Sequence, residues 1–353
     1  MRRGRARGGD TDAVGPAHVT ERTHEAVVVE TPGEPPVVRR WDPPSPRSGE
    51  ITIRVSAAPI APLDLLCATG RSYFGVPPTP YVPGVQGVGT IEQGTAAVPA
   101  GTTVWFATSA GMSPGDGSMR AVAVAPERDV VALPGSADPA LVAALGLSGV
   151  AAWMSLTWRG QVAAGEQVLV LGAGGVVGQA AVQLARTAGA RRVLAAARSP
   201  AARDRARRLE PDALVEMDDA DDVETLAARI RDACDGPLDL VVDPLFGIPC
   251  AAALHVLRPH GRLVNLGGSA GELSPITSSI LRSQSLRVLG YTNNELTPDQ
   301  RRDALLRVVG EASAGRLHVA HEVVPLGRVT DAWSRQSSGQ AAGRIVLTPD
   351  ENM

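Results

Sequence analysis

Apolar residues in the first part of the chain occur in short runs that alternate with polar residues. Ile51, Ile53 and Val55 alternate in this way directly after a turn at 47–49. Four further short apolar runs, separated by Gly and Pro, lie at 26–29, 104–107, 121–125 and 130–133. A period of two indicates half-buried strands. The first part of the chain is therefore predicted to be mostly β-structure.

The pattern changes from about Ala140, where an apolar, alanine-rich stretch through Trp153 predicts a helix. Strand and helix patterns then alternate. Strands are expected at 168–171, 192–196, 240–242 and 262–266, and helices at 179–188 and 201–209. Such alternation requires right-handed crossovers and a parallel sheet with helices on both faces. The tail from about Thr297 returns to a helix and short strands that end at 343–347.

These patterns predict an α/β protein with two domains. A doubly wound parallel sheet is expected at 144–290, and a β-rich domain is expected from 24–143 together with 291–353. A chain with about 300 ordered residues buries roughly 75% of its unfolded surface, which is enough for a substantial core. Residues 1–23 are predicted to form a disordered basic leader.

The charged residues restrict the possible chemistry, because all 34 basic side chains are arginine and the chain contains no lysine. The absence of lysine excludes a Schiff-base lysine and the phosphate-binding lysine of a P-loop. Proton transfer near neutral pH must then come from His, Tyr, Cys, a carboxylate or water. A formal net charge of −3 and an aromatic content of 3% argue against nucleic-acid binding.

The cysteines and the apolar runs bear on the cellular location. Cys67, Cys234 and Cys250 lack CxxC spacing, so neither a disulfide framework nor a thiolate zinc site is expected. No run approaches 18 apolar residues, and the N-terminus lacks the apolar core of a signal peptide. We therefore expect a cytoplasmic protein that does not bind a membrane.

A glycine-rich turn directly follows the apolar strand at 168–171. Small residues at such a turn let the backbone approach a pyrophosphate, whose charge is stabilised by free N–H groups and by the dipole of the next helix. The strand, turn and helix together predict a dinucleotide site. Its candidate residues are Gly172, Gly174, Gly175, Val176, Val177 and Gly178.

The end of the second strand of this sheet indicates which dinucleotide is bound. The segment after Ala197 contains Arg198, Ser199 and Pro200, with no carboxylate to accept the ribose hydroxyls of NAD. Ser199 and Pro200 have the pattern of an N-cap and a first helical residue, and Arg203 follows within about one turn. This arrangement favours NADPH. The alternative is that both arginines are solvated surface residues.

With these residues in hand, the chain resembles the medium-chain dehydrogenase/reductase superfamily, and within it the zinc-independent quinone oxidoreductase branch of the zeta-crystallin type. The resemblance covers about residues 24–349 and implies a Rossmann domain plus a GroES-like catalytic domain. It also implies cofactor contacts by Asp243, Leu266 and Gly267, and a homodimer that uses 286–290 as an edge strand. The matching motifs are 49–50, Asp64 with Gly70, 83–84 with Gly87 and Gly89, 165–166, 239–243, 261–264 and 343–347.

Metal-binding residues of the zinc-dependent relatives are replaced in this chain. The positions that match their ligands are Ala61, Val85 and Gln86, which form no plausible zinc site. No metal is therefore expected. The histidines lack ligand spacing, and structural or surface roles are expected for His18, His24, His255, His260, His318 and His321.

Without a Lewis acid, hydride transfer is expected to an already activated acceptor, such as a quinone or the conjugated C=C of an unsaturated carbonyl compound. The resemblance implies that Tyr73 and Asp64 lie in the catalytic cleft. Tyr73 could instead cover an apolar pocket with Phe74, and Asp64 could cap the following helix. Each of these two alternatives remains open.

Two positions depart from the family pattern. An asparagine usual in this branch is Ala61 here, and a threonine common beside the nicotinamide is Ala151. The loss of two donors favours either a larger apolar, conjugated substrate that is held mainly by shape, or catalysis that depends less on donors from the protein. The alternatives are a biosynthetic tailoring reductase specific for one large apolar intermediate, or a non-catalytic NADPH-binding protein.

Overall fold

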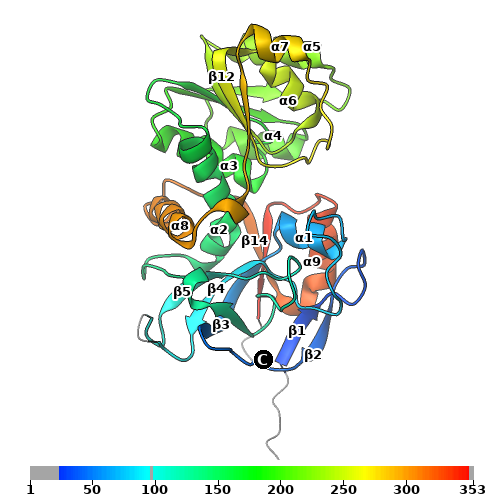
Figure 1. Cartoon of the computed structure of the whole chain (residues 1–353), viewed down its shortest axis with the longest axis vertical. Helices are drawn as coiled ribbons and strands as arrows, with labels where there is room; N and C mark the ends of the chain where they lie inside the picture. The colour runs from blue at the N-terminus through cyan, green and yellow to red at the C-terminus, as the bar shows by residue number, and fades with distance from the viewer. Residues whose placement is uncertain (1–23, 96–97, 350–353) are drawn as a thin grey trace, which may run out of the picture.

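The computed structural model describes residues 24–95 and 98–349, and the leader predicted at 1–23 lies outside this part of the chain. Two domains are visible, joined at a waist that contains α2 and α8 (Figure 1). The strands are β1 His24–Val28, β2 Val37–Trp41, β3 Glu50–Pro59, β4 Gln86–Ile91, β5 Thr103–Ala107, β6 Val122–Pro126, β7 Val130–Ala132, β8 Gln167–Val170, β9 Arg192–Ala197, β10 Ala213–Glu216, β11 Leu238–Asp243, β12 Leu257–Asn265, β13 Arg287–Gly290, β14 His321–Pro325 and β15 Arg344–Thr348. The helices are α1 Pro62–Ala68, α2 Pro139–Met154, α3 Val176–Thr187, α4 Pro200–Arg207, α5 Val223–Ala233, α6 Gly247–Leu254, α7 Ser278–Ser283, α8 Pro298–Ser313 and α9 Val329–Ser337, with short turns at η1 Glu127–Asp129, η2 Ser155–Arg159, η3 Asn293–Glu295 and η4 Leu326–Arg328.

One sheet is the predicted doubly wound parallel sheet. Its six strands run in the order β10-β9-β8-β11-β12-β13, and every neighbouring pair is parallel. The order reverses next to β8, so the carboxyl ends of β8 and β11 flank the point at which such sheets bind ligands. Strand β13, predicted as an edge strand, lies at one end of the sheet. The Rossmann prediction is confirmed.

The other large sheet forms the β-rich domain. Its path is β14-β15-β3-β4-β5-β7, with β6 paired to β3, and β1 pairs with β2 in a separate ribbon. Strands β14 and β15 come from the end of the chain and complete the sheet that the first part of the chain begins. Segments from the start and from the end of the described chain therefore share one sheet.

Helix α2 crosses the predicted domain boundary at 143/144 and packs on α3, α8 and β4. Together with η2 it is long and apolar enough to cross a membrane, but 72% of its most apolar window is buried inside the fold. The helix breaks at Gly146, whose φ of 26° and ψ of −124° are not helical. A Cβ at Gly146 would lie 2.0 Å from Gln86 Oε1, so a glycine is required where that side chain enters the break.

Candidate functional site

The glycine turn between β8 and α3 is built so that only glycine fits at key positions. Gly172 has a φ of +63°, in the region that favours glycine. A Cβ on Gly178 would lie 2.3 Å from the carbonyl oxygen of Gly172, and a Cβ on Gly174 would lie 2.4 Å from the Cβ of Ala202. Gly178 therefore allows the helix to pack closely on the turn, and Gly174 allows α4 to approach it.

The first turn of α3 presents backbone N–H groups that have no carbonyl partner within the helix. Gly175 is the N-cap, is exposed, and contributes no side-chain cap. The amides of Val176, Val177 and Gly178 occupy the first three helical positions, where a helix leaves its donors free. These donors and the positive end of the helix dipole suit a pyrophosphate. The predicted glycine-turn residues thus lie together in a form that fits a dinucleotide.

Helix α4 begins beside this turn, as predicted. Ser199 caps the helix by accepting a hydrogen bond from the Ala202 N–H at 3.3 Å, and Pro200 is the first helical residue. Gly174 approaches Ala202 closely, so the start of α4 is fixed against the glycine turn. Ser199 is therefore placed near the cofactor turn, although its hydroxyl oxygen already accepts one hydrogen bond.

The two arginines predicted to select NADPH carry carboxylate partners. Arg198 pairs with Asp219, and Arg203 Nη1 lies 2.7 Å from Glu216 Oε2. The sequence at the end of β9 contains no carboxylate. Glu216 at the end of β10 was not predicted, although β9 and β10 are parallel neighbours whose last residues, Ala197 and Glu216, are in register at the same edge of the sheet.

Two side chains connect the glycine turn to the catalytic domain, and neither was predicted. The carbonyl oxygen of Gly174 accepts from Gln179 Nε2 at 3.0 Å and from Arg205 Nε at 2.9 Å. Gln179 Oε1 also accepts from the N–H of Ala320, and Arg205 Nη1 donates to the carbonyl of Ala342. The turn is thus hydrogen-bonded to the segments that precede β14 and β15.

Asp243 has a structural role instead of the predicted cofactor contact. Its carboxylate is fully buried, and Oδ1 accepts from the N–H groups of Leu245 and Phe246, both at 2.9 Å. Oδ2 accepts from Asn265 Nδ2 at 3.1 Å. Burial raises the pKa of this carboxyl above its ordinary value. The prediction is corrected because each carboxylate oxygen is already bonded inside the protein.

Leu266 and Gly267 lie at the carboxyl end of β12, at the edge of the sheet that carries the glycine turn. The N–H of Leu266 donates to the carbonyl of Asp243 at 2.9 Å. A Cβ on Gly267 would lie 2.9 Å from the carbonyl oxygen of Pro244. Both residues are half-buried. They lie at the same edge of the sheet as the turn, with β11 between β8 and β12, and the cofactor contact remains a prediction.

Asp64 also has a structural role, as the helix-capping alternative proposed. It is 1% exposed and lies in the first turn of α1. Oδ2 accepts from the N–H of Ala61 at 2.8 Å, and Oδ1 accepts from Gly84 at 3.0 Å and Val85 at 2.9 Å. The prediction of a catalytic role for Asp64 is therefore corrected, because a buried carboxylate with three backbone donors does not face a substrate. Asp64 ties α1 to the turn before β4.

Burial raises the pKa of Asp64 to about 6, although three backbone N–H groups and Arg344 favour its charged form. The folded-state pKa lies above the ordinary value of 3.8, so the folded protein binds the extra proton between about pH 4 and 6. Stability from this group should therefore fall as the pH rises through this window. We expect the stability of the native protein relative to Asp64→Asn to fall by about 2 kcal/mol between pH 4.5 and 7.5.

Urea unfolding of both proteins at the two pH values measures this difference. Other titrating groups are shared by the two proteins, so their contributions cancel in the comparison. A relative stability that is constant with pH, or that rises with pH, would show that Asp64 stays ionised in the folded state.

Tyr73 lies in the loop after α1 and reaches across to the segment that follows β13. Its side chain is 78% exposed, and its ring is 4.4 Å from the ring of Phe74. The hydroxyl oxygen accepts from Asn294 Nδ2 at 3.1 Å and lies 3.5 Å from Thr292 Oγ1. An accepted bond from Asn294 leaves the phenol proton available to another acceptor. Both alternatives for Tyr73 are consistent with this placement.

The positions that match zinc ligands hold other contacts. Gln86 Oε1 accepts from Trp105 Nε1 at 3.0 Å and from the N–H of Leu147 at 2.7 Å, inside the break of α2. Ala61 and Val85 are buried and have no ligating atom. Within residues 24–95 and 98–349, no group of three or more His, Cys, Asp and Glu side chains is placed to hold a metal ion. The donor set here does not fit zinc.

Two hollows in the described surface lie away from the glycine turn. One, of about 260 Å³, lies among Pro77, Tyr81 and Asp116, and the other, of about 310 Å³, lies between Gln183 and His318. Neither includes a predicted site residue. We assign the candidate site from the glycine turn and its free donors, because these features have a chemical match in a dinucleotide.

Comparison with known proteins agrees with this geometry. Residues 47–135 match the alcohol dehydrogenase GroES-like domain, and residues 176–309 match the zinc-binding dehydrogenase family. A quinone oxidoreductase of Lama guanicoe is 27% identical over 337 residues, which cover 93% of this chain and 98% of the relative. A mycobacterial structure in complex with NADPH has a TM-score of 0.80 at 22% identity, covering 93% of this chain and all of that one.

A third relative is a phenolphthiocerol/phthiocerol polyketide synthase of Mycobacterium tuberculosis. It is 30% identical over 228 residues, which cover 62% of this chain and 10% of that protein. The fold and the glycine turn define a nicotinamide-dependent oxidoreductase. The chain belongs to the medium-chain dehydrogenase/reductase superfamily, in its quinone oxidoreductase-like branch, which confirms the predicted resemblance.

Proposed function

We propose that the protein is a zinc-independent reductase that uses NADPH and reduces a quinone or the conjugated C=C of an α,β-unsaturated carbonyl compound. The observation that carries the proposal is the glycine turn, with free N–H groups at Val176, Val177 and Gly178 beside the start of α4. When bound, NADPH supplies the hydride. The protein holds the pyrophosphate on this turn and presents Arg203 toward the adenosine end.

The chemistry of the catalytic domain supports an activated acceptor. Gln86 is committed to Trp105 and Leu147, and Ala61 and Val85 offer no ligand, so the protein has no Lewis acid site at the matched positions. Reduction then depends on an acceptor that already carries a conjugated carbonyl. The remaining tasks for the chain are to stabilise an enolate oxygen and to deliver a proton.

An exposed group of apolar side chains near Tyr73, called the apolar lip below, supports a conjugated, apolar substrate. Leu66, Phe74 and Val76 are exposed near Tyr73, on α1 and the loop that follows it. Ala61 and Ala151, which replace polar family residues, are both buried. This lip would contact a substrate by shape and apolar area, because it offers few hydrogen-bond donors.

Tyr73 is the proton donor in this proposal. We expect Tyr73→Phe to lower kcat by roughly 10- to 100-fold with little change in the KM for NADPH, because the ring stays and only the hydroxyl is lost. Steady-state kinetics with a panel of quinones and enones measures this effect. Phe74→Leu is the control, since it changes the neighbouring ring and leaves the hydroxyl in place.

The same panel tests the reaction itself. We expect NADPH consumption, followed by nicotinamide absorbance, with at least one quinone or enone. A silent panel from a protein that binds NADPH would count against the proposed reaction. An unchanged kcat in Tyr73→Phe would assign Tyr73 to covering the pocket, and the donor would then be water or a carboxylic acid.

A tailoring reductase for one large apolar intermediate is a second candidate. The similarity to a polyketide synthase favours it, together with the apolar lip at Leu66, Phe74 and Val76. A strong preference for large apolar enones within the panel would support this candidate, and equal turnover of small quinones would oppose it.

We further propose that the protein acts as a homodimer through the coenzyme domain. Strand β13 lies at the end of its sheet, and Val288 is partly exposed on it. An edge strand with free backbone groups can pair with the same strand of a second copy.

A further inference from the structure

Strand β10 places a carboxylate at the adenosine end of the candidate cofactor site. Glu216 is the last residue of β10 and is in register with Ala197, the last residue of β9. The two parallel strands therefore end at the same edge of the sheet, next to Arg198 and Ser199. The carboxylate of Glu216 on β10 thus lies at the edge where the sequence at the end of β9 contains no carboxylate.

Arg203 is held by three acceptors around this edge. Nη1 donates to Glu216 Oε2 at 2.7 Å, Nη2 donates to the carbonyl of Met217 at 2.7 Å, and Nε donates to the carbonyl of Ala197 at 3.4 Å. The Arg203 side chain is 20% exposed and that of Glu216 is 49% exposed. The arginine is therefore fixed in place, whereas its carboxylate partner can turn toward solvent.

The charges at this edge are balanced in pairs. Arg203 pairs with Glu216, Arg198 pairs with Asp219, and Arg207 pairs with Asp204 at 2.8 Å. Arg207 also reaches Glu216 Oε1 at 3.2 Å. A dianionic phosphate that arrives here meets arginines whose charge is already compensated, so it must compete with the carboxylates.

We propose that Glu216 is a specificity-determining residue that competes with the 2'-phosphate of NADPH for Arg203. This inference rests on the proposed cofactor site. Glu216 lowers the affinity for NADPH because the phosphate has to displace it or bind beside its negative charge. NADH has only a neutral hydroxyl at this position, so its affinity depends much less on the charge of Glu216. The residue therefore sets the ratio of the two affinities.

Glu216→Gln tests the proposal, because it removes the charge and keeps the size and an acceptor oxygen. We expect the Kd for NADPH to fall roughly threefold to tenfold, with the Kd for NADH changed less than about twofold. The measurement is fluorescence titration of each reduced dinucleotide with the full-length protein at low salt. The gain should shrink at high ionic strength, where exposed charges are screened.

Asp204→Asn is the matched control. It removes one carboxylate from the same cluster, where Asp204 pairs with Arg207 while Arg203 pairs with Glu216. A local effect predicts that this variant leaves the NADPH-to-NADH ratio nearly unchanged. An equal gain in both variants would overturn the inference, since it would show a general charge effect.

Arg203→Ala separates the inference from the proposed cofactor. We expect Arg203→Ala to weaken the binding of NADPH more than that of NADH. In the double variant, we expect Glu216→Gln no longer to raise the affinity for NADPH. If Arg203→Ala weakens NADPH while Glu216→Gln leaves the ratio unchanged, the competition is wrong and the cofactor proposal stands. If Arg203→Ala leaves the ratio unchanged, Arg203 does not bind the phosphate and the competition is wrong, whereas the proposed cofactor site is overturned only if Gly178→Ala also binds NADPH as tightly as the native protein.

Discussion

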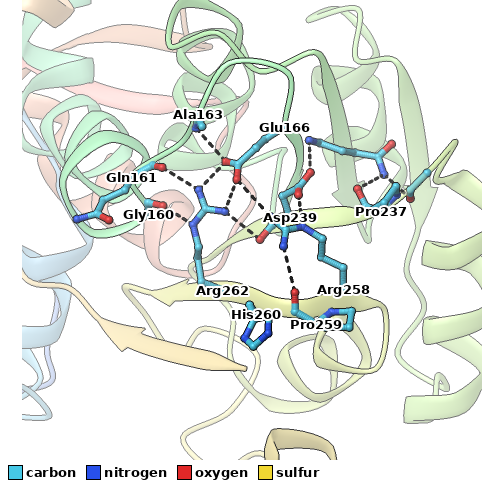
Figure 2. A network of polar contacts seen from close by, with 12 residues as sticks. Gly160, Gln161, Ala163, Glu166, Pro237, Asp239, Arg258, Pro259, His260 and Arg262 are labelled. Carbon is cyan, nitrogen blue, oxygen red and sulfur yellow. Dashed lines mark hydrogen bonds and ion pairs between the residues drawn. The ribbon is translucent and has the colours of Figure 1, made fainter. Parts of the chain in front are cut away.

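Replacing Arg262 by alanine is expected to lower the free energy of unfolding by about 3–5 kcal/mol. Arg262 lies on β12 with its side chain 5% exposed. Its guanidinium bonds both oxygens of Glu166, at 2.8 and 2.5 Å, and the carbonyls of Gly160, Gln161 and Asp239 (Figure 2). Removal would leave the partly buried carboxylate of Glu166 with the N–H of Ala163 at 2.9 Å and the more distant Arg258 at 3.8 Å, and the three carbonyls would lose the guanidinium donor that they share.

The location of this network explains the size of the expected effect. Gly160 and Gln161 directly follow η2, the last turn of the helix that runs between the domains, and Glu166 directly precedes β8. Arg262 therefore fixes the connection from the waist to the central strand of the parallel sheet. An alanine would loosen this connection as well as unpair the acceptors.

Arg258→Ala is the matched control, because Arg258 belongs to the same network and is 38% exposed. The Arg258 side chain reaches solvent, and its carboxylate partner Asp239 keeps a hydrogen bond from the N–H of Gln167 at 2.8 Å, so we expect a smaller loss of about 1–2 kcal/mol. Urea unfolding of both variants gives the comparison. Equal losses in the two variants would show that burial of Arg262 does not determine its contribution.

Replacing Gly178 by alanine is expected to abolish tight NADPH binding and to destabilise the Rossmann domain by about 2–3 kcal/mol. The new Cβ would lie 2.3 Å from the carbonyl oxygen of Gly172 and 2.6 Å from Cα of Ala173, and both atoms belong to the backbone. The helix would have to move away from the turn. The donors of its first turn would then no longer converge on the pyrophosphate.

Gly175→Ala is the control for the stability part of this second prediction. A Cβ on Gly175 has its nearest neighbour at 3.5 Å, and its φ of −81° is open to any residue. We expect a cost of at most about 1 kcal/mol in stability. Urea unfolding and NADPH titration measure both variants. If Gly178→Ala binds NADPH as tightly as the native protein, the turn does not hold the dinucleotide.

Local sequence patterns predicted most of the fold, because strand and helix periods depend on neighbouring residues. The strand, glycine turn and helix at 168–188 are an example, since small residues between two periodic segments leave few backbone alternatives. Ser199 followed by Pro200 likewise marked the start of α4. Each of these signals lies within a few residues of the feature that it predicts.

The predictions for single polar residues were less successful, because their partners come from distant segments. Asp243 and Asp64 looked available in the sequence, but the fold surrounds them with backbone N–H groups. For Asp64, the donors of Gly84 and Val85 are about twenty residues away along the chain. A carboxylate placed this way is structural, which its residue type alone does not reveal.

The sequence alone determined two features of this protein. Its lack of lysine restricts the groups that can transfer a proton, and its glycine-rich segment between a strand and a helix predicts the dinucleotide turn. The tertiary structure decided which arginine charges remain available. Glu216 meets Arg203 because β9 and β10 are parallel neighbours whose carboxyl ends coincide, a pairing made between strands and not between adjacent residues. The tertiary structure likewise decided the partners of Gln179 and Arg205, whose side chains form hydrogen bonds both with the glycine turn and with the other domain. These partners are distant in sequence, and only folding brings them close enough for a hydrogen bond.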